Sequence, residues 1–360
     1  MFNLNPRLHW RGEMSDYVSA IAVSPDGHWI AIADAGGQVC RIELGTLKIS
    51  ELQGNSGQSI DCLEFSPDGQ FLAAAGQAGT VMLWRMQPEI ELITTLEYPR
   101  AWIDRLVWHP TELKLVFQAG FDLYIVNLAN IGGTGVKAPS IGGLGADKIV
   151  QLPIGATAQA IQWHPQGHLL AIAANDRLIA LLDGKWDQES VIPLAAPATT
   201  IGWSQDGRYL ALGNLECHLF MWEWGNPDPW RMQGFPGKVS QIAWSDDDQL
   251  VMSSLEGVVR WERSGDDWQN QIGLEHQDKV MAIAFSPSLS SPSLSSPGSS
   301  LLASGGQDGR LILWRDGRMA GRLKGFGSGI ASLAWSSLGD YLIVGGVNGE
   351  LRIWEIGNDS

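Results

Sequence analysis

The segment from Val280 to Trp314 is one of eight similar copies, and this repetition constrains the fold more than any other feature of the chain. Without a serine- and proline-rich insert, the segment reads VMAIAFSP and then LLASGGQDGRLILW. Short runs of alternating apolar residues, separated by glycine, proline and aspartate, are typical of half-buried β-strands joined by turns. A period near 40 residues indicates that each copy is one unit packed against its neighbours. The sequence therefore predicts a repeated all-β fold.

The copies agree in register as well as in composition. Each begins with a small or aliphatic residue, has an aliphatic residue three positions later, and has an aromatic residue or valine two positions after that. Two inserts, 131–147 and 286–300, lengthen the third and seventh copies, and their low-complexity composition predicts mobile loops. The eight copies begin at Val18, Ile60, Ile103, Ala158, Ala198, Val239, Val280 and Ile330.

Two motifs make this repeat recognisable. SPDG turns occur at 24–27 and 66–69, and the seventh copy contains SGGQDGRLILW at 304–314. In these motifs and in its period the chain resembles the WD-repeat β-propeller family, of the bacterial type. The resemblance implies a single domain over residues 1–360, a closed eight-bladed propeller of four-stranded antiparallel blades. It also implies a non-enzymatic scaffold that binds a partner protein or peptide on a propeller face.

The residues before the first copy also match the repeat. Asn5–Gly12 (NPRLHWRG) resembles the segments that precede later copies, such as DPWRMQG at 228–234. In the WD-repeat family such a segment is the outer strand of a blade, so the resemblance implies that the N-terminal strand completes the last blade. This pairing would cover strand edges that otherwise invite aggregation.

Composition argues against several classes of partner. The formal net charge is −15, so the average field repels nucleic-acid phosphates and anionic membrane surfaces. Three cysteines without a CxxC pair fit a reducing compartment. The first residues lack the features of a signal peptide, and no run of about 18 apolar residues could span a bilayer. We expect a cytoplasmic protein that is a monomer within a larger complex, with no nucleic acid or membrane as partner.

The seventh copy contains a polar set that could be mistaken for a catalytic site. Serine, histidine and aspartate together can act as a hydrolase triad. The resemblance assigns them instead, with a tryptophan, to the hydrogen-bonded structural tetrad of the WD-repeat family. There the aspartate orients the imidazole, and the serine links it to the indole. The tetrad residues are His276, Ser304, Asp308 and Trp314, and the other seven copies lack the full set.

Candidate catalytic and metal-ligating residues are few. His109 and His164 occupy equivalent turn positions in adjacent copies, but zinc needs three or four ligands, so turn histidines are the favoured interpretation. We therefore expect no catalytic residue, no metal ion and no cofactor. The alternative is a propeller enzyme or metal-binding protein with a site in the central channel. Its candidate residues are Asp61 and Asp104, the carboxylates at the second position of the inner strands.

The loops that enter the inner strands carry aromatic and basic side chains. In the WD-repeat family the face built by these loops is the usual docking surface, and aromatic and arginine residues dominate interface hot spots. Trp102 stands directly before Ile103, where other copies mostly have small or polar residues. An alternative interpretation is that Trp102 and Tyr98 merely cover blade three. The predicted partner-binding residues are Tyr17, Arg100, Trp102, Lys238 and Lys279.

Overall fold

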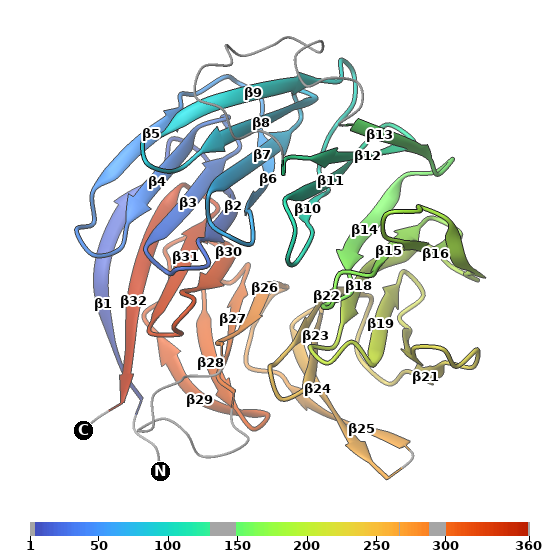
Figure 1. Cartoon of the computed structure of the whole chain (residues 1–360). Coiled ribbons are helices and arrows are strands. Elements are labelled where there is room, and N and C mark those ends of the chain that lie inside the picture. Colours follow the sequence, from blue (N-terminus) through green and yellow to red (C-terminus); the bar gives the residue numbers. More distant parts are fainter. Residues whose placement is uncertain (1–3, 130–148, 266, 288–299, 359–360) are drawn as a thin grey trace. The chain divides into compact units, whose positions relative to one another are not determined.

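The computed structural model describes residues 4–129, 149–265, 267–287 and 300–358. Within these ranges the chain forms 32 strands, arranged in eight four-stranded antiparallel sheets that we call blades (Figure 1). The same ranges contain no helix long and apolar enough to cross a membrane. The chain divides into two compact units, residues 19–192 and residues 1–18 with 193–360.

The unit of residues 19–192 contains blades one to four, each built from four consecutive strands. Blades one and two consist of β2 (Val18–Val23), β3 (Trp29–Asp34), β4 (Val39–Glu43), β5 (Ile49–Gln53), β6 (Ile60–Phe65), β7 (Phe71–Gly76), β8 (Thr80–Arg85) and β9 (Glu91–Glu97). Blades three and four consist of β10 (Leu106–Trp108), β11 (Lys114–Ala119), β12 (Asp122–Asn127), β13 (Ile149–Pro153), β14 (Ala158–Trp163), β15 (Leu169–Ala174), β16 (Arg177–Leu182) and β17 (Gln188–Pro193).

The other unit contains blades five to eight, and blade eight combines the last three strands with the first strand of the chain. Blades five and six consist of β18 (Ala198–Trp203), β19 (Tyr209–Asn214), β20 (Leu219–Glu223), β21 (Trp230–Met232), β22 (Val239–Trp244), β23 (Leu250–Ser254), β24 (Gly257–Ser264) and β25 (Asp267–Gly273). Blades seven and eight consist of β26 (Val280–Phe285), β27 (Leu302–Gly306), β28 (Leu311–Arg315), β29 (Arg318–Leu323), β30 (Ile330–Trp335), β31 (Tyr341–Gly346), β32 (Glu350–Asn358) and β1 (Leu4–Glu13).

Strand β1 is the outer strand of blade eight. It pairs antiparallel with β32, from Leu4 opposite Asn358 to Glu13 opposite Glu350. The fold class predicted from the sequence, an all-β eight-bladed propeller of four-stranded blades with the N-terminal strand in the last blade, is therefore confirmed. The prediction that the whole chain is a single domain stays a prediction.

The SPDG motifs form the turns between the first and second strands of blades one and two. In blade one the Ser24 hydroxyl accepts a hydrogen bond from the Trp29 N–H over 2.9 Å, and Asp26 accepts one from the His28 N–H over 3.0 Å. Gly27 has a φ of +73°, a left-handed conformation that glycine adopts without the steric cost of a Cβ. The motif thus fixes the register of the hairpin from within the turn.

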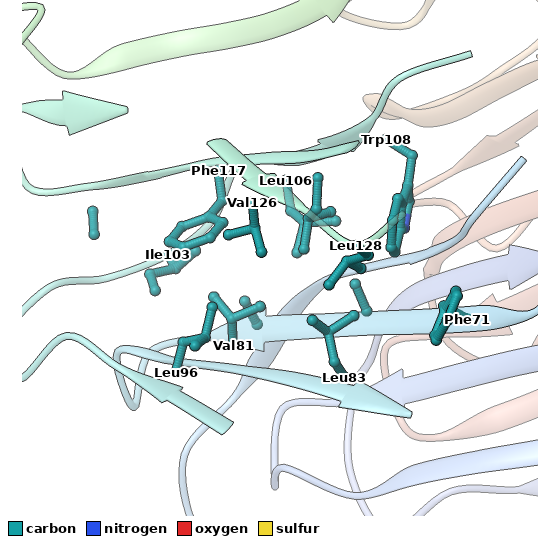
Figure 2. Close-up of a cluster of buried hydrophobic side chains, with 14 residues drawn as sticks. Phe71, Val81, Leu83, Leu96, Ile103, Leu106, Trp108, Phe117, Val126 and Leu128 are labelled. Atoms are coloured by element: carbon teal, nitrogen blue, oxygen red, sulfur yellow. The ribbon is translucent and has the colours of Figure 1, made fainter. Parts of the chain in front are cut away.

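The core lies mainly in the second strands and in the layers between blades. In β7 the residues from Leu72 to Ala75 are completely buried. Figure 2 shows one such layer, in which Leu83 of β8 belongs to the same apolar cluster as Leu106 and Phe117 of blade three. Burying a side chain of this size contributes about 1.5–3 kcal/mol. Packing between neighbouring blades is therefore a major source of stability.

Blade three departs from the register that the repeat predicts for its first strand. The copy begins at Ile103, but β10 starts at Leu106. Ile103 is fully buried, and its N–H donates to the Gly76 carbonyl of blade two over 3.1 Å. Arg105 donates from Nε to the Gln159 carbonyl of blade four over 2.7 Å. Within blade three, the Arg105 carbonyl still accepts the Gln118 N–H over 3.2 Å, so the segment before β10 stays bound to the second strand.

The inserts fall mainly outside the described residues. Insert 131–147 lies wholly outside them, and of 286–300 the structure describes Ser286, Pro287 and Ser300. The Ser286 N–H donates to the Leu301 carbonyl over 2.7 Å, and the equivalent Ser24 N–H donates to the Trp29 carbonyl in blade one. The second insert therefore begins at the position where blade one has its SPDG turn. The predicted mobility of the inserts concerns residues outside the described ranges.

Candidate functional site

The four residues of the predicted tetrad come together in blade seven. His276 precedes β26, Ser304 lies in β27, Asp308 in the following turn and Trp314 in β28. Imidazole Nε2 lies 2.8 Å from Ser304 Oγ, and Nδ1 lies 3.2 Å from Asp308 Oδ1. The Trp314 indole N–H donates to the same serine oxygen over 2.7 Å. The arrangement links a loop, two strands and a turn of one blade.

The tetrad is too enclosed to act as a hydrolase triad. Both His276 and Ser304 are buried, and the serine oxygen is already used by the imidazole and the indole. Burial lowers the pKa of His276 below its ordinary value, which favours the neutral imidazole. Burial by itself would raise the pKa of Asp308, but the N–H groups of Gln277 and Arg310, with His276, hold it below its usual range. We therefore interpret the set as structural.

Removal of the imidazole tests this interpretation. In His276→Ala the buried Ser304 hydroxyl loses a partner, so we expect the free energy of unfolding to fall by about 1–3 kcal/mol. A double-mutant cycle with Ser304→Ala, measured by urea denaturation, should show a coupling of at least about 0.5 kcal/mol. Independent, additive effects of the two changes would contradict the interpretation.

The third-strand tryptophans of other blades have no such serine. Positions equivalent to Ser304 are aliphatic or methionine in blades five, six and eight. The corresponding indole nitrogens are buried, and among the described residues they have no hydrogen-bond partner. Apolar packing therefore holds these indoles in place. They belong to Trp222, Trp261 and Trp354.

His109, Glu112 and Asp183 form a group whose potential metal-ligand atoms lie within 4.8 Å of one another. Lys114 Nζ lies among them, 2.6 Å from Asp183 Oδ2 and 3.0 Å from Glu112 Oε2, so an ammonium group already neutralises the carboxylates. Both ring nitrogens of His109 are also engaged, since Nε2 lies 3.0 Å from the Gly167 carbonyl and Nδ1 accepts the Glu112 N–H over 3.0 Å. The group fits an ion pair between blades three and four better than a metal site.

The carboxylates considered for an enzyme each have partners of their own. Asp61 accepts hydrogen bonds from the Ser59 hydroxyl over 3.0 Å and from the Trp102 indole N–H over 2.6 Å. Asp104 lies 3.2 Å from the guanidinium of the adjacent Arg105. Both carboxylates therefore hold neighbouring residues in place.

Glu64 is an unusual group that the sequence did not single out. It lies on β6, where burial raises the pKa of its carboxyl to about 8, although the Trp108 N–H donates to Oε2 over 3.1 Å and opposes the shift. At neutral pH this carboxyl is mostly protonated. The burial of this carboxyl on the first strand of blade two could be recognised only from the structure.

The raised pKa of Glu64 implies a pH dependence of stability. Between pH 4.5 and about pH 8, the folded protein keeps a proton on Glu64 that the unfolded chain releases. The contribution of Glu64 to stability therefore falls as the pH rises through this range. We expect Glu64→Gln to remove this pH dependence. The difference in free energy of unfolding between variant and wild type should then shift in favour of the variant by up to a few kcal/mol from pH 5 to pH 9. Parallel stability curves for the two proteins, from urea denaturation across this range, would contradict the assignment.

Trp102 is presented to solvent by a well-anchored loop. Its side chain is 59% exposed, while its indole N–H is bound to Asp61. The loop begins at Tyr98, whose ring lies 4.4 Å from Tyr124 and 5.3 Å from Phe117. Tyr98 therefore covers blade three, as the alternative interpretation of the sequence holds, whereas Trp102 projects from it.

The other predicted docking residues are distributed over both units. Arg100, on the same loop as Trp102, is exposed, has a φ of +72° and has no partner among the described residues. In the other unit Lys238 and Lys279 are exposed, and Tyr17 is half-buried. The role of all five residues in binding stays a prediction.

Phe121 is an exposed aromatic residue that the sequence interpretation missed. It lies in the turn between β11 and β12, and its side chain is 63% exposed. Leu106 pairs with Phe117 across β10 and β11, so this turn and the Trp102 loop lie at the same end of blade three. The sequence contained a signal for this residue: it directly follows the glycine of a tight turn. A turn does not require an aromatic side chain, so an exposed aromatic residue could have been predicted here.

Four segments of the chain match the WD40 family (WD domain, G-beta repeat): residues 5–41, 46–85, 269–315 and 317–355. These four segments are thus similar to WD40 repeats, and the eight four-stranded blades have the architecture that such repeats form. Telomerase protein component 1 of Rattus norvegicus is 21% identical over 325 residues, 85% of this chain and 11% of that protein. WD repeat-containing protein 1 of Gallus gallus is 22% identical over 312 residues, 82% of this chain and 46% of that protein. The chain thus spans less than half the length of either relative.

Two solved structures share the fold. The Sqt1 protein of Chaetomium thermophilum, in a structure bound to the N-terminus of the ribosomal protein L10, aligns with a TM-score of 0.78, 17% identity and coverage of 95% of this chain and 97% of that one. The Cps50 (Swd1) β-propeller domain of Myceliophteria thermophila aligns with a TM-score of 0.63, 14% identity and coverage of 98% and 100%. All these proteins are eukaryotic, so the predicted bacterial type has no support.

Proposed function

We propose that the chain is a protein-interaction scaffold and that the loop of residues 98–102 in blade three contacts a partner protein or peptide. The observation that carries the proposal is Trp102, whose side chain is 59% exposed although Asp61 fixes its indole N–H. A large aromatic side chain that is already held in place loses little conformational entropy on binding. Such residues dominate interface hot spots. Phe121, at the same end of the blade, would extend the contact.

The relatives support a protein as the partner. Sqt1, which shares the fold, is seen bound to the N-terminus of a ribosomal protein. An exposed aromatic residue beside the unpaired charge of Arg100 suits a peptide segment that carries an apolar and an acidic side chain. In the other unit, Tyr17, Lys238 and Lys279 are separate candidate binding residues.

The rest of the assignment rests on charge and on the enclosure of the tetrad. The net charge of −15 disfavours nucleic acid and anionic membranes, and three free cysteines suit the reducing cytoplasm. The buried tetrad and the ion-paired His109 group favour a scaffold over an enzyme. We propose a cytoplasmic, non-enzymatic protein that is a monomer within a larger complex.

Affinity purification of tagged variants from the source cells tests the proposal. Trp102→Ala should reduce recovery of the direct partner about ten- to thirtyfold. Arg100→Gly removes the guanidinium and suits the left-handed backbone, so it should weaken binding while the protein stays folded. Leu338→Ala is the matched control, since Leu338 is 61% exposed and lies in a turn of blade eight. Equal recovery of every partner with Trp102→Ala and Leu338→Ala would overturn the proposal.

A further inference from the structure

A pocket lies between blades six and seven, which belong to the same unit. Its apolar wall includes Val251, Val258 and Leu302, which are almost fully buried. Strands β23, β24, β27 and β28 of Figure 1 provide most of this wall. The polar side chains at the pocket are Gln249, Arg260, Gln271, Ser300 and Asp316.

The equivalent space between blades five and six is filled. The strand registers place Tyr209, Met221 and Trp230 of blade five at the positions that Gln249, Arg260 and Gln271 occupy in blade six. Tyr209 is buried there, with its ring stacked 6.4 Å from that of Trp244. The layer between blades six and seven thus has three polar residues at the positions where the layer between blades five and six has two aromatic residues and a methionine.

The facing blade does not compensate for this difference. Against the first layer, blade six presents Leu250, Trp244 and Trp261. Against the second layer, blade seven presents the equivalent Leu302, Phe285 and Trp314. The facing walls are similar, but polar side chains stand where the other layer has mostly aromatic ones. This leaves an open volume, which a packed core would normally exclude.

The polar side chains are held in a defined arrangement. Arg260 donates from Nε to Gln249 Oε1 over 3.0 Å, and its Nη2 lies 2.5 Å from Glu262 Oε1. The Gln249 amide nitrogen in turn donates to Asp247 over 2.7 Å. A Cβ on Gly317 would lie 2.3 Å from Gln271 Oε1, so glycine in this turn leaves room for the glutamine at the pocket.

We propose that this pocket binds an extended peptide segment of a partner protein, with one large apolar side chain in the pocket and a basic residue beside Asp316. The apolar walls suit an aliphatic or aromatic side chain. The Gln271 amide can both donate and accept, as the peptide group requires. Arg260 and Glu262 pair with each other, whereas Asp316 has no partner among the described residues and so favours a cation. This site is independent of the proposed docking at Trp102.

Peptide phage display on the full chain, with synthetic peptides of the selected consensus measured by titration calorimetry, tests the proposal. The consensus should contain a large apolar residue next to lysine or arginine. The triple variant Gln249→Tyr, Arg260→Met, Gln271→Trp gives this layer the side chains of its filled neighbour. It should melt at or above the wild-type temperature and bind at least about tenfold more weakly. Gln271→Trp alone provides a milder filling variant should the triple variant fail to fold.

Two further variants test separately the role of the Asp316 charge and whether residues 288–299 occupy the pocket. Asp316→Asn keeps shape and should weaken the basic peptide about two- to fivefold, with loss of salt dependence. Replacing residues 288–299 with Asp-Gly would recreate an SPDG-like turn after Ser286, and it should leave peptide affinity unchanged. Trp102→Ala should also leave it unchanged.

Peptides that bind the filled variants as well as the wild type would overturn the proposal. So would a selection that yields no apolar and basic consensus, and so would a peptide that binds only after removal of residues 288–299, since the chain itself would then be the occupant.

Discussion

A variant that lacks residues 1–13 should melt about 5–10 °C or more below the full-length chain and should form oligomers. Strand β1 pairs along β32 from Leu4 to Glu13, so its removal leaves the backbone groups of a long strand unpaired. It also exposes Trp354 and Ile356, which are buried and belong to the same apolar cluster as Leu8. Unpaired, apolar strand edges are templates for association.

Calorimetry and size-exclusion chromatography with light scattering measure both effects. A synthetic peptide of residues 1–13, added in excess, should raise the melting temperature again because it binds the folded state. A truncated protein that stays monomeric and melts within a degree or two of the intact chain would show that β1 is dispensable.

The substitution Gly76→Ala should be among the most destabilising changes of one methyl group, at about 3–5 kcal/mol. A Cβ at Gly76 would lie 1.9 Å from the Ser59 carbonyl oxygen and 2.8 Å from the Ile60 Cα, and these backbone atoms cannot rotate away. The Gly76 carbonyl also accepts the Ile103 N–H, so a shift here would reach blade three.

Gly45→Ala is the matched control, because a Cβ there would meet no atom within 4 Å. The control should change the free energy of unfolding by no more than about 0.5 kcal/mol in urea denaturation. Equal stabilities of the two alanine variants would contradict the close approach of β6 and β7 at this point.

The strands and their pairing could be predicted from the sequence because the same pattern of apolar and turn residues occurs in eight copies. The alternation in VMAIAF or LLASGG predicts a strand, and SPDG predicts the turn that joins two of them. The placement of β1 followed from the resemblance of NPRLHWRG to later outer strands. The approach of His276, Ser304, Asp308 and Trp314 was likewise visible, because the seventh copy keeps the motif that carries them.

What the sequence did not reveal depends on exceptions within a copy. Ile103 fits the repeat, yet its N–H bonds to Gly76 of the adjacent blade and the strand starts three residues later. Glu64 looked like an ordinary charged residue until its desolvated position on β6 was known. The pocket beside Arg260 could be recognised only by comparing layers between blades, which requires the strand registers.

Site-specific photo-crosslinking tests the central claim, docking of a partner protein at blade three, most directly. A photoreactive phenylalanine analogue would replace Trp102 in one protein and Leu338, which is similarly exposed, in another. Irradiation in the source cells should give a discrete covalent adduct with a protein from position 102 and none from position 338. Adducts with nucleic acid, or the same adducts from both positions, would contradict the claim.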